Sequence, residues 1–323
     1  MQLGVFTVLF QNLPFDAMVE KVQDLGLEFV EIGTGAYAGG AHCDIDRLLD
    51  DPAALRHYSS VLAHGNLRVS ALACQGNPLH PNLEIASEHR TAFEKTVRLA
   101  ERLDVEVINL LSGCPGDSLQ AKYPNWASCA WPPDYPELLK WQWEEVAIPY
   151  WRSAAEFAAQ HGIRKLAIEM HPGFLVYNPE TLLRLRRAVG ESIGCNFDPS
   201  HLWWLGIDVP LAIKELGREG ALYHCHAKDV LIDRFNTARN GCLDTKPYPQ
   251  VKDRSWTFRS VGWGHDLAQW REIATAFRLA EYDYVMSIEH EDPLASVDEG
   301  LRHSVLCLRQ ALLVEPAGEA YWA

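Results

Sequence analysis

The strongest fold signal lies in three segments that read KLAIEMHPG (165–173), IGCNFDPSH (193–201) and ALYHCHAKD (221–229). A fourth segment, DYVMSIEHED (283–292), has the same form near the end of the chain. Each begins with a short apolar run of strand length and ends in acidic or histidine residues. Helix-like stretches separate these runs, so we expect the runs to pair as parallel strands joined by crossover helices.

The same alternation extends over the whole chain. The predicted strands cover residues 3–10, 28–32, 67–73, 106–111, 165–170, 193–197, 221–227 and 283–289. The predicted helices cover residues 14–25, 51–64, 87–103, 142–161, 178–189, 208–217, 266–279 and 296–313. Eight strands alternating with eight helices favour a closed (β/α)8 TIM barrel over an open doubly wound sheet, since no GxGxxG motif follows the first strand. Without a visible linker or repeat, residues 1–323 are expected to form a single domain.

Two predicted connections are longer than a minimal loop between a strand and a helix. They follow the fourth and seventh strands and cover residues 112–140 and 230–265. In a barrel such loops lie over the C-terminal face, where active sites are built. Both are therefore expected either to close over a substrate or to pack against the barrel rim or a partner subunit.

Composition and charge exclude several classes of protein. Of the 323 residues, 48% are hydrophobic and 22% are charged, as is typical of a folded globular chain. The formal net charge of −14 argues against nucleic-acid binding, which needs clustered Lys and Arg. No run approaches the ~20 apolar residues of a membrane helix. The eight cysteines form no CxxC pair, which favours a reduced, cytoplasmic enzyme over a disulfide scaffold.

Polar side chains at four strand ends are expected to converge. Glu169, Asp198 and Glu289 end the fifth, sixth and eighth predicted strands, and His224 and His226 lie in the seventh. The C-terminal ends of barrel strands meet on one rim, where three carboxylates would repel one another unless a cation joined them. Oxygen-rich ligation with one nitrogen suits Mn²⁺ first, with Mg²⁺, Co²⁺ or Zn²⁺ as alternatives. Both histidines share one face of their strand, so spacing alone leaves open which one is the ligand.

These residues resemble those of the xylose isomerase-like sugar isomerases and epimerases, a family of (β/α)8 barrels that includes ketose 3-epimerases and endonuclease IV type repair enzymes. The resemblance covers nearly the whole chain and is strongest over residues 165–293. It implies that the metal ligands are Glu169, Asp198, His226 and Glu289. It also implies that the two glutamates serve as the catalytic acid/base pair.

Substrate contacts are indicated by the same resemblance and by neighbouring residues. His201 occupies the place of a substrate-contacting histidine, three residues after the aspartate, and GWGHDLAQW (262–270) is similar to the Gly-x-Gly lead into a helix of the family. After the seventh strand, AKDVLIDRFN (227–236) replaces the Asn-Arg-Arg stretch of the simple epimerases. The expected substrate-binding residues are His171, His201, His224, Lys228, Arg259 and Trp263.

The predicted function is that of a sugar isomerase or epimerase that removes a proton α to a carbonyl and passes through an enediolate. The insertion 230–265 also resembles a branch with catalytic subunits of C-glycoside deglycosidases, so a lyase that cleaves a 3-keto glycoside by β-elimination is the alternative. A hydrolase of the endonuclease IV type would bind DNA, for which an acidic chain is poorly suited. A scaffold protein without activity would have no need for the four predicted metal ligands. The expected partner is a small carbohydrate, and the aromatic-rich loops also suit a homo-oligomer or a small partner subunit.

Overall fold

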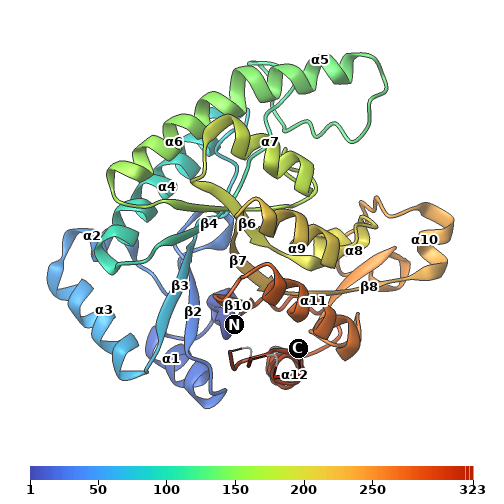
Figure 1. The fold of residues 1–323 in the computed structure, drawn as a ribbon. Helices are drawn as coiled ribbons and strands as arrows, with labels where there is room; N and C mark the ends of the chain where they lie inside the picture. Colours follow the sequence, from blue (N-terminus) through green and yellow to red (C-terminus); the bar gives the residue numbers. More distant parts are fainter. Residues whose placement is uncertain (317, 320, 323) are drawn as a thin grey trace.

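A closed barrel of eight parallel strands forms the centre of the molecule (Figure 1). The computed structural model describes residues 1–316, 318, 319, 321 and 322. Around the barrel the strands follow the order β1-β10-β7-β6-β5-β4-β3-β2. They are β1 Gln2–Phe6, β2 Phe29–Gly33, β3 Arg68–Ala73, β4 Val107–Leu111, β5 Lys165–Glu169, β6 Ile193–Phe197, β7 Leu222–Ala227 and β10 Val285–Ile288. The predicted (β/α)8 TIM barrel is confirmed.

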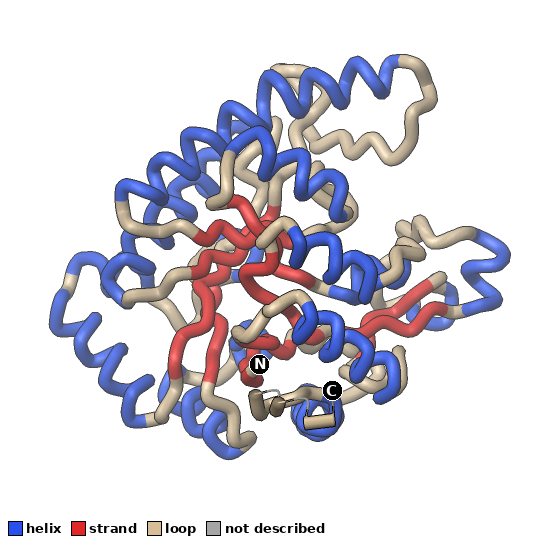
Figure 2. Tube along the Cα trace, viewed as in Figure 1, coloured by secondary structure: helices blue, strands red, loops and turns tan. Residues whose placement is uncertain are grey.

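Helices surround the barrel on its outside (Figure 2). Several begin where side chains satisfy the free N–H groups of the first turn, as in the capping boxes of Asn178 and Asp266. The helices are α1 Phe15–Asp24, α2 Ile45–Asp50, α3 Pro52–His64, α4 Leu83–Leu103, α5 Asp134–Trp141, α6 Ile148–Gln160, α7 Pro179–Val189, α8 Pro199–Trp204, α9 Val209–Arg218, α10 Arg234–Asn240, α11 Leu267–Leu279 and α12 Val297–Ala311.

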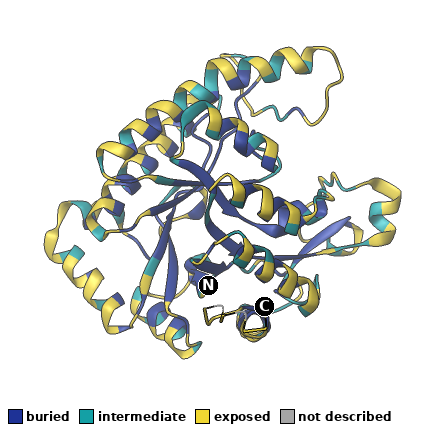
Figure 3. Cartoon of the chain, viewed as in Figure 1, coloured by how far each residue is buried: buried dark blue, intermediate teal, exposed yellow. Residues whose placement is uncertain are grey.

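The hydrophobic core lies between the barrel strands and the inner faces of the helices. Figure 3 shows the strands buried almost throughout, whereas the helices alternate between buried and exposed faces. Phe197 on β6 packs edge-on against Phe277 on α11, with ring centroids 5.5 Å apart, and both side chains are fully buried. Such close packing fixes each strand relative to its helix, so the strand ends are held in a rigid frame.

Two predicted strands, 3–10 and 283–289, are longer than the observed ones by three residues each. The first strand ends at Phe6 because Thr7–Phe10 turns into a 3-10 helix, and the Thr7 hydroxyl donates a hydrogen bond to the backbone oxygen of Glu31. The eighth barrel strand ends at Ile288, so Glu289 lies in the first position of the loop that follows. Its backbone N–H still donates to the backbone oxygen of Ala227 at 3.2 Å, which keeps Glu289 beside the end of β7.

Both predicted long loops contain secondary structure that the sequence patterns did not indicate. The connection after β4 ends in α5, which runs through a π-helix over Gln142–Ala147 into α6. The connection after β7 forms an antiparallel pair of strands, β8 Asp229–Ile232 and β9 Trp256–Arg259, with α10 between them. In Figure 1 these two excursions extend from the same side of the molecule. The long connections after the fourth and seventh strands are confirmed, but the elements inside them were not predicted, because short apolar runs such as Trp256–Arg259 pair only with a distant partner strand.

Among the helices that the structure describes, none combines the length and apolar character that crossing a bilayer requires.

Candidate metal centre and substrate cavity

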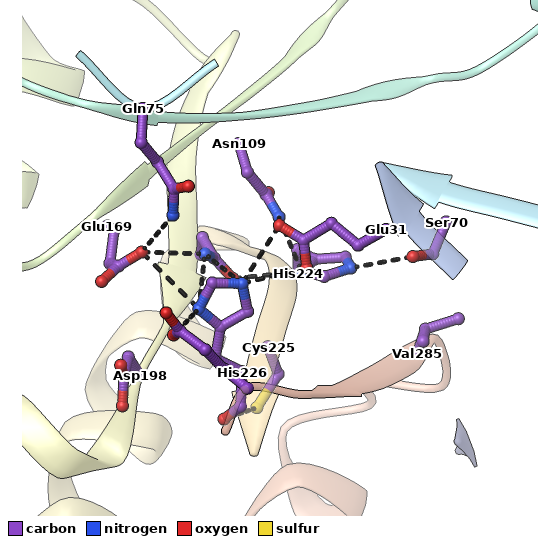
Figure 4. Close-up of polar contacts among 12 residues, drawn as sticks. Glu31, Ser70, Gln75, Asn109, Glu169, Asp198, His224, Cys225, His226 and Val285 are labelled. Carbon is purple, nitrogen blue, oxygen red and sulfur yellow. Dashed lines mark hydrogen bonds and ion pairs between the residues drawn. The ribbon is translucent and has the colours of Figure 1, made fainter. Parts of the chain in front are cut away.

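Four potential ligands meet at the C-terminal ends of neighbouring barrel strands. Glu169 ends β5, Asp198 directly follows β6, His226 lies in β7 and Glu289 directly follows β10. One oxygen or nitrogen atom from each lies within 4.8 Å of the corresponding atoms of the other three, and all four residues come from predicted positions. Figure 4 shows the Glu169, Asp198 and His226 side chains gathered around this point.

The geometry separates the two histidines of β7. The Nδ1 atom of His226 lies 3.0 Å from Glu289 Oε2 and 3.6 Å from Glu169 Oε2, which places it within the four-residue group. His224 lies outside that group and is fully buried, with Nε2 3.3 Å from the Ser70 hydroxyl. The structure therefore places His226, and not His224, among the four candidate ligands.

The four residues fit a divalent cation. Asp198 uses Oδ1 to accept a hydrogen bond from the backbone N–H of Ser200 at 2.8 Å, which leaves Oδ2 without a donor among the described residues. Glu289 Oε2 is likewise buried and faces Nδ1 of His226 at 3.0 Å. Buried carboxylate oxygens without donors are costly unless a cation balances them. Three carboxylates and one imidazole match the preference of Mn²⁺, Mg²⁺ or Zn²⁺.

Lys228 adds a buried positive charge beside this group. Its Nζ atom lies 2.6 Å from Glu291 Oε2, 3.4 Å from Glu289 Oε2 and 3.8 Å from Asp198 Oδ2. Burial alone would lower the pKa of Lys228, but Glu289 and Glu291 outweigh burial and hold it well above its usual value. The ammonium group therefore stays charged and can attract a developing negative charge in the cavity.

Two histidines after β5 and β6 lie next to the carboxylates. His201 Nε2 is 3.2 Å from Glu169 Oε1 and 3.3 Å from Asp198 Oδ2, and the ring of His171 lies 4.1 Å from that of His201. Burial lowers the pKa of His171 to about 3 and that of His201 well below its usual value. Both rings are therefore neutral at pH 7 and can donate or accept one hydrogen bond at each nitrogen.

A cavity of about 510 Å³ opens above the four ligands. Its polar wall includes Glu169, His171, Lys228 and Glu289. The rest of the lining is largely aromatic, and two of the aromatic residues come from the excursion after β7. The aromatic lining residues are Phe6, Tyr37, Phe174, Tyr248 and Phe258. A cavity that combines convergent polar groups with apolar walls is typical of a small-molecule site.

Several residues of the site escaped the sequence analysis. Gln75, after β3, donates a hydrogen bond from Nε2 to Glu169 Oε2 at 2.8 Å. Glu31 on β2 lies 3.0 Å from His226 Nε2, and Asn109 on β4 donates to Glu31 at 2.8 Å. An acid inside the apolar run FVEIG (29–33) was a usable signal for Glu31. Nothing in the local pattern marked Gln75 or Asn109, since single amides in or after strands are common.

Arg259 and Trp263 are not among the residues that line this cavity. Arg259 donates from Nε to Asp292 Oδ2 at 3.0 Å, and the ring of Trp263 stacks on His303 with centroids 4.4 Å apart. Both side chains thus hold the loop after β9 against neighbouring segments. Neither is brought to the four candidate ligands in this structure.

Asp229, at the start of β8, anchors the turn before α11. Its carboxylate accepts hydrogen bonds from the backbone N–H groups of Gly262 (2.9 Å), Gly264 (3.1 Å) and His265 (3.0 Å) and from the indole of Trp270 (3.2 Å). Removing a buried acceptor leaves such donors unsatisfied.

We expect Asp229→Ala to lower the free energy of unfolding by about 3 kcal/mol, because one buried and three partly buried donors lose their acceptor together. Urea unfolding followed by tryptophan fluorescence measures the loss. Asp233→Ala is the control, since it removes one helix cap on α10 and should cost only about 1 kcal/mol. Equal losses in the two variants would contradict the anchoring role of Asp229.

Comparison with known proteins agrees with this fold. A family model described as xylose isomerase-like TIM barrel matches residues 19–311. The chain belongs to this family. The uncharacterized protein YfiH of Bacillus subtilis (strain 168) is 40% identical over 314 residues, which cover 97% of this chain and 99% of YfiH.

Solved structures share the architecture of this xylose isomerase-like barrel. The probable 3-DHS dehydratase AsbF from Bacillus anthracis superposes with a TM-score of 0.66 at 17% identity, covering 96% of this chain and 99% of AsbF. A D-tagatose 3-epimerase-like protein superposes with a TM-score of 0.64 at 18% identity, covering 96% of this chain and 99% of its own. At these identities the likeness concerns the fold.

Proposed function

We propose that this chain is a divalent-cation-dependent isomerase or epimerase that acts on a keto sugar by removing a proton α to its carbonyl. One observation carries the proposal. Glu169 and Glu289 belong to the group of four potential ligands and both line the same cavity. A substrate bound there would therefore meet two carboxylates at the place where a cation is held. The solved structures that share this fold include a D-tagatose 3-epimerase-like protein, which supports the same class of reaction.

Glu169, Asp198, His226 and Glu289 are the residues that would hold the cation. A bound divalent cation would polarise the sugar carbonyl and make the neighbouring C–H more acidic. Its identity is left open between manganese, magnesium, cobalt and zinc, because the oxygen-rich set with one imidazole accepts all four.

The two glutamates act as the acid and the base. One carboxylate removes the α-proton to give an enediolate, and the other returns a proton to the opposite face in an epimerisation or to the adjacent carbon in an isomerisation. Gln75 holds Glu169 in place by donating to its Oε2 atom. Lys228, buried at the polar wall, stabilises the negative charge that develops on the substrate oxygens.

Substrate recognition falls to the polar side of the cavity. His171 and Lys228 line it, and His201 lies directly behind Glu169 and Asp198. These neutral rings and the ammonium group suit the hydroxyl groups of a sugar, which both donate and accept hydrogen bonds. His224 is more distant from the cavity and contacts Asn109 and Ser70 instead.

A second candidate reaction is β-elimination from a 3-keto glycoside. The observation that favours it is the aromatic wall formed by Tyr248 and Phe258, which belong to the excursion after β7. Apolar rings on one side of a cavity of about 510 Å³ could hold a leaving aglycone, which a free monosaccharide does not have. The same base would remove the α-proton, and the electron pair would then expel the β-substituent instead of capturing a proton.

The experiment is proton NMR in D₂O after incubation with cation-loaded protein, using free ketoses and 3-keto glycosides and removing the cation with EDTA before recording. We expect deuterium at the carbon next to the carbonyl. An epimer or isomer as product supports the first reaction, and release of an aglycone supports the second. Cation-loaded protein that exchanges no proton in any of these sugars would contradict the proposal.

Cation affinity should depend on pH. Burial raises the pKa of Asp198 to about 8, with Glu169 and Glu289 adding to the effect and Lys228 opposing it. A cation displaces the proton from this carboxyl group, and also one from His226, whose pKa Glu31 and Glu289 hold well above its usual value against the effect of burial. Binding should therefore strengthen by at least about tenfold per pH unit as the pH rises toward about 8. Isothermal titration calorimetry in two buffers of different ionisation enthalpy measures the affinity and the protons released. Affinity that is constant between about pH 6 and 8 would contradict the involvement of Asp198.

A further inference from the structure

A buried carboxylate lies behind the candidate metal centre, on the side away from the cavity. Glu31 on β2 is fully buried and does not line the cavity. Its Oε2 and Oε1 atoms lie 3.0 Å and 3.1 Å from Nε2 of His226. Figure 4 shows Glu31 and Glu169 on different sides of the His226 ring. The acid/base chemistry proposed above makes no use of Glu31, yet a buried carboxylate without a role would be costly.

The two nitrogens of the His226 ring face different carboxylates, while the Asn196 amide nitrogen lies 3.4 Å from Nδ1 and 3.2 Å from Nε2. Nδ1 lies among the oxygens of Glu289 and Glu169, whereas Nε2 faces Glu31. A neutral imidazole carries its proton on one nitrogen and binds a cation through the other. A carboxylate at Nε2 favours the proton on that atom and thereby frees the Nδ1 lone pair.

Glu31 is itself held in place. Asn109 on β4 donates from Nδ2 to Glu31 Oε1 at 2.8 Å, and Thr7 donates to the backbone oxygen of Glu31 at 3.0 Å. The ring of Phe6 stacks on that of His226 with centroids 5.8 Å apart and an angle of 18° between the planes. The orientation of the imidazole is therefore fixed by contacts on one face and at Nε2.

We propose that Glu31 is a positioning residue for the cation site: it accepts a hydrogen bond from Nε2–H of His226 and so holds Nδ1 as the coordinating atom. This inference rests on the proposed function, since it assigns a role within the proposed cation site. It adds an outer contact that fixes the ligand, and such contacts tune metal affinity by about 10–100-fold.

Glu31 has one competing role, as a direct ligand of a second cation. Atoms of Glu31, His224 and His226 also lie within 4.8 Å of one another. However, the Asn109 amide nitrogen lies 2.8 Å from Glu31 Oε1 and 3.0 Å from His224 Nδ1. A donor N–H group between two prospective ligands occupies the lone pairs that a cation would need. The contacts therefore favour the positioning role.

The first test uses the wild-type chain with ¹⁵N-labelled histidine and Zn²⁺ as the probe. Long-range ¹H–¹⁵N spectra identify which nitrogen is protonated, and the His226 signals are those absent from His226→Ala. We expect one zinc ion per chain, with His226 protonated at Nε2 and coordinated through Nδ1. Coordination through Nε2, or a second zinc ion bound by Glu31, would overturn the inference.

The second test compares zinc affinity in Glu31→Gln and Glu28→Gln, measured by competition with a fluorescent chelator. Glu28 is an exposed acid just before β2, so its variant removes one negative charge without touching His226. Both carboxylate oxygens of Glu31 lie within 3.1 Å of His226 Nε2, so in Glu31→Gln an NH₂ group must take the place of one of them and face the Nε2–H donor. We expect zinc to bind about 10–100-fold more weakly to Glu31→Gln than to the control.

The outcomes separate the inference from the proposed function. If the wild-type protein binds no zinc, both the proposed cation site and the role of Glu31 are refuted. Wild-type binding with equal affinity in the two glutamine variants would remove only the role of Glu31. Near-ultraviolet circular dichroism of the ion-free variants checks that they fold. If Glu31→Gln does not fold, the His226 tautomer measured in the wild-type protein tests the role of Glu31 by itself.

Discussion

Replacing Glu289 by glutamine, or Glu169 by glutamine, is expected to lower turnover by about 10³-fold. Glutamine keeps the size of the side chain but can neither remove nor return a proton at neutral pH. Both glutamates line the cavity next to the proposed cation, so each loss removes one half of the acid/base pair. The measurement is the initial rate on the sugar that exchanges its α-proton, at saturating substrate and cation.

Because both glutamates are also candidate ligands, the cation content of each variant must be measured beside its rate. A variant that retains its cation but loses turnover has lost proton transfer. Glu106→Gln serves as the control, since Glu106 is exposed and pairs with Lys165 at the start of β5. Unchanged turnover in both cavity variants would refute the acid/base assignment.

Removing the imidazole of His226 is expected to weaken cation binding by at least about 100-fold. Loss of an outer contact alone costs about 10–100-fold, and a direct ligand contributes more. In His226→Ala the three carboxylates Glu169, Asp198 and Glu289 remain, so residual weak binding is expected. Inductively coupled plasma mass spectrometry after dialysis against a fixed free-ion concentration measures the occupancy.

The variant to compare with His226→Ala is His224→Ala. It removes the other histidine of β7, which lies outside the four-residue group, so a smaller effect on occupancy is expected. His57→Ala controls for an exposed histidine. Full occupancy in His226→Ala together with loss in His224→Ala would transfer the ligand role to His224.

The barrel was predictable because its signals are local. Each central strand is an apolar run buried on both faces, and most of the predicted strands match the observed ones to within one or two residues. The excursions were not predictable to the same degree. In the β8–β9 pair, Asp229 lies opposite Arg259 and Ile232 lies opposite Trp256. No local sequence pattern indicates a partner strand so far along the chain.

The candidate site divides in the same way. The ends of consecutive parallel strands must meet on one rim, so Glu169, Asp198 and Glu289 could be placed together from the sequence. The choice between the two histidines of β7 depends on ring orientation, which spacing does not encode. Arg259 was expected to replace the missing Asn-Arg-Arg stretch, and Trp263 was expected at the rim because Gly262 and Gly264 flank it. In the structure, hydrogen bonding and stacking hold them elsewhere.

The most direct test of the central claim is a crystal structure of the protein soaked in Mn²⁺, with anomalous diffraction data to locate the ion. The account predicts one peak bounded by oxygens of Glu169, Asp198 and Glu289 and by Nδ1 of His226, at about 2.0–2.6 Å from each. A peak between Glu31 and His224, or bound manganese without a peak at the four-residue group, would contradict it.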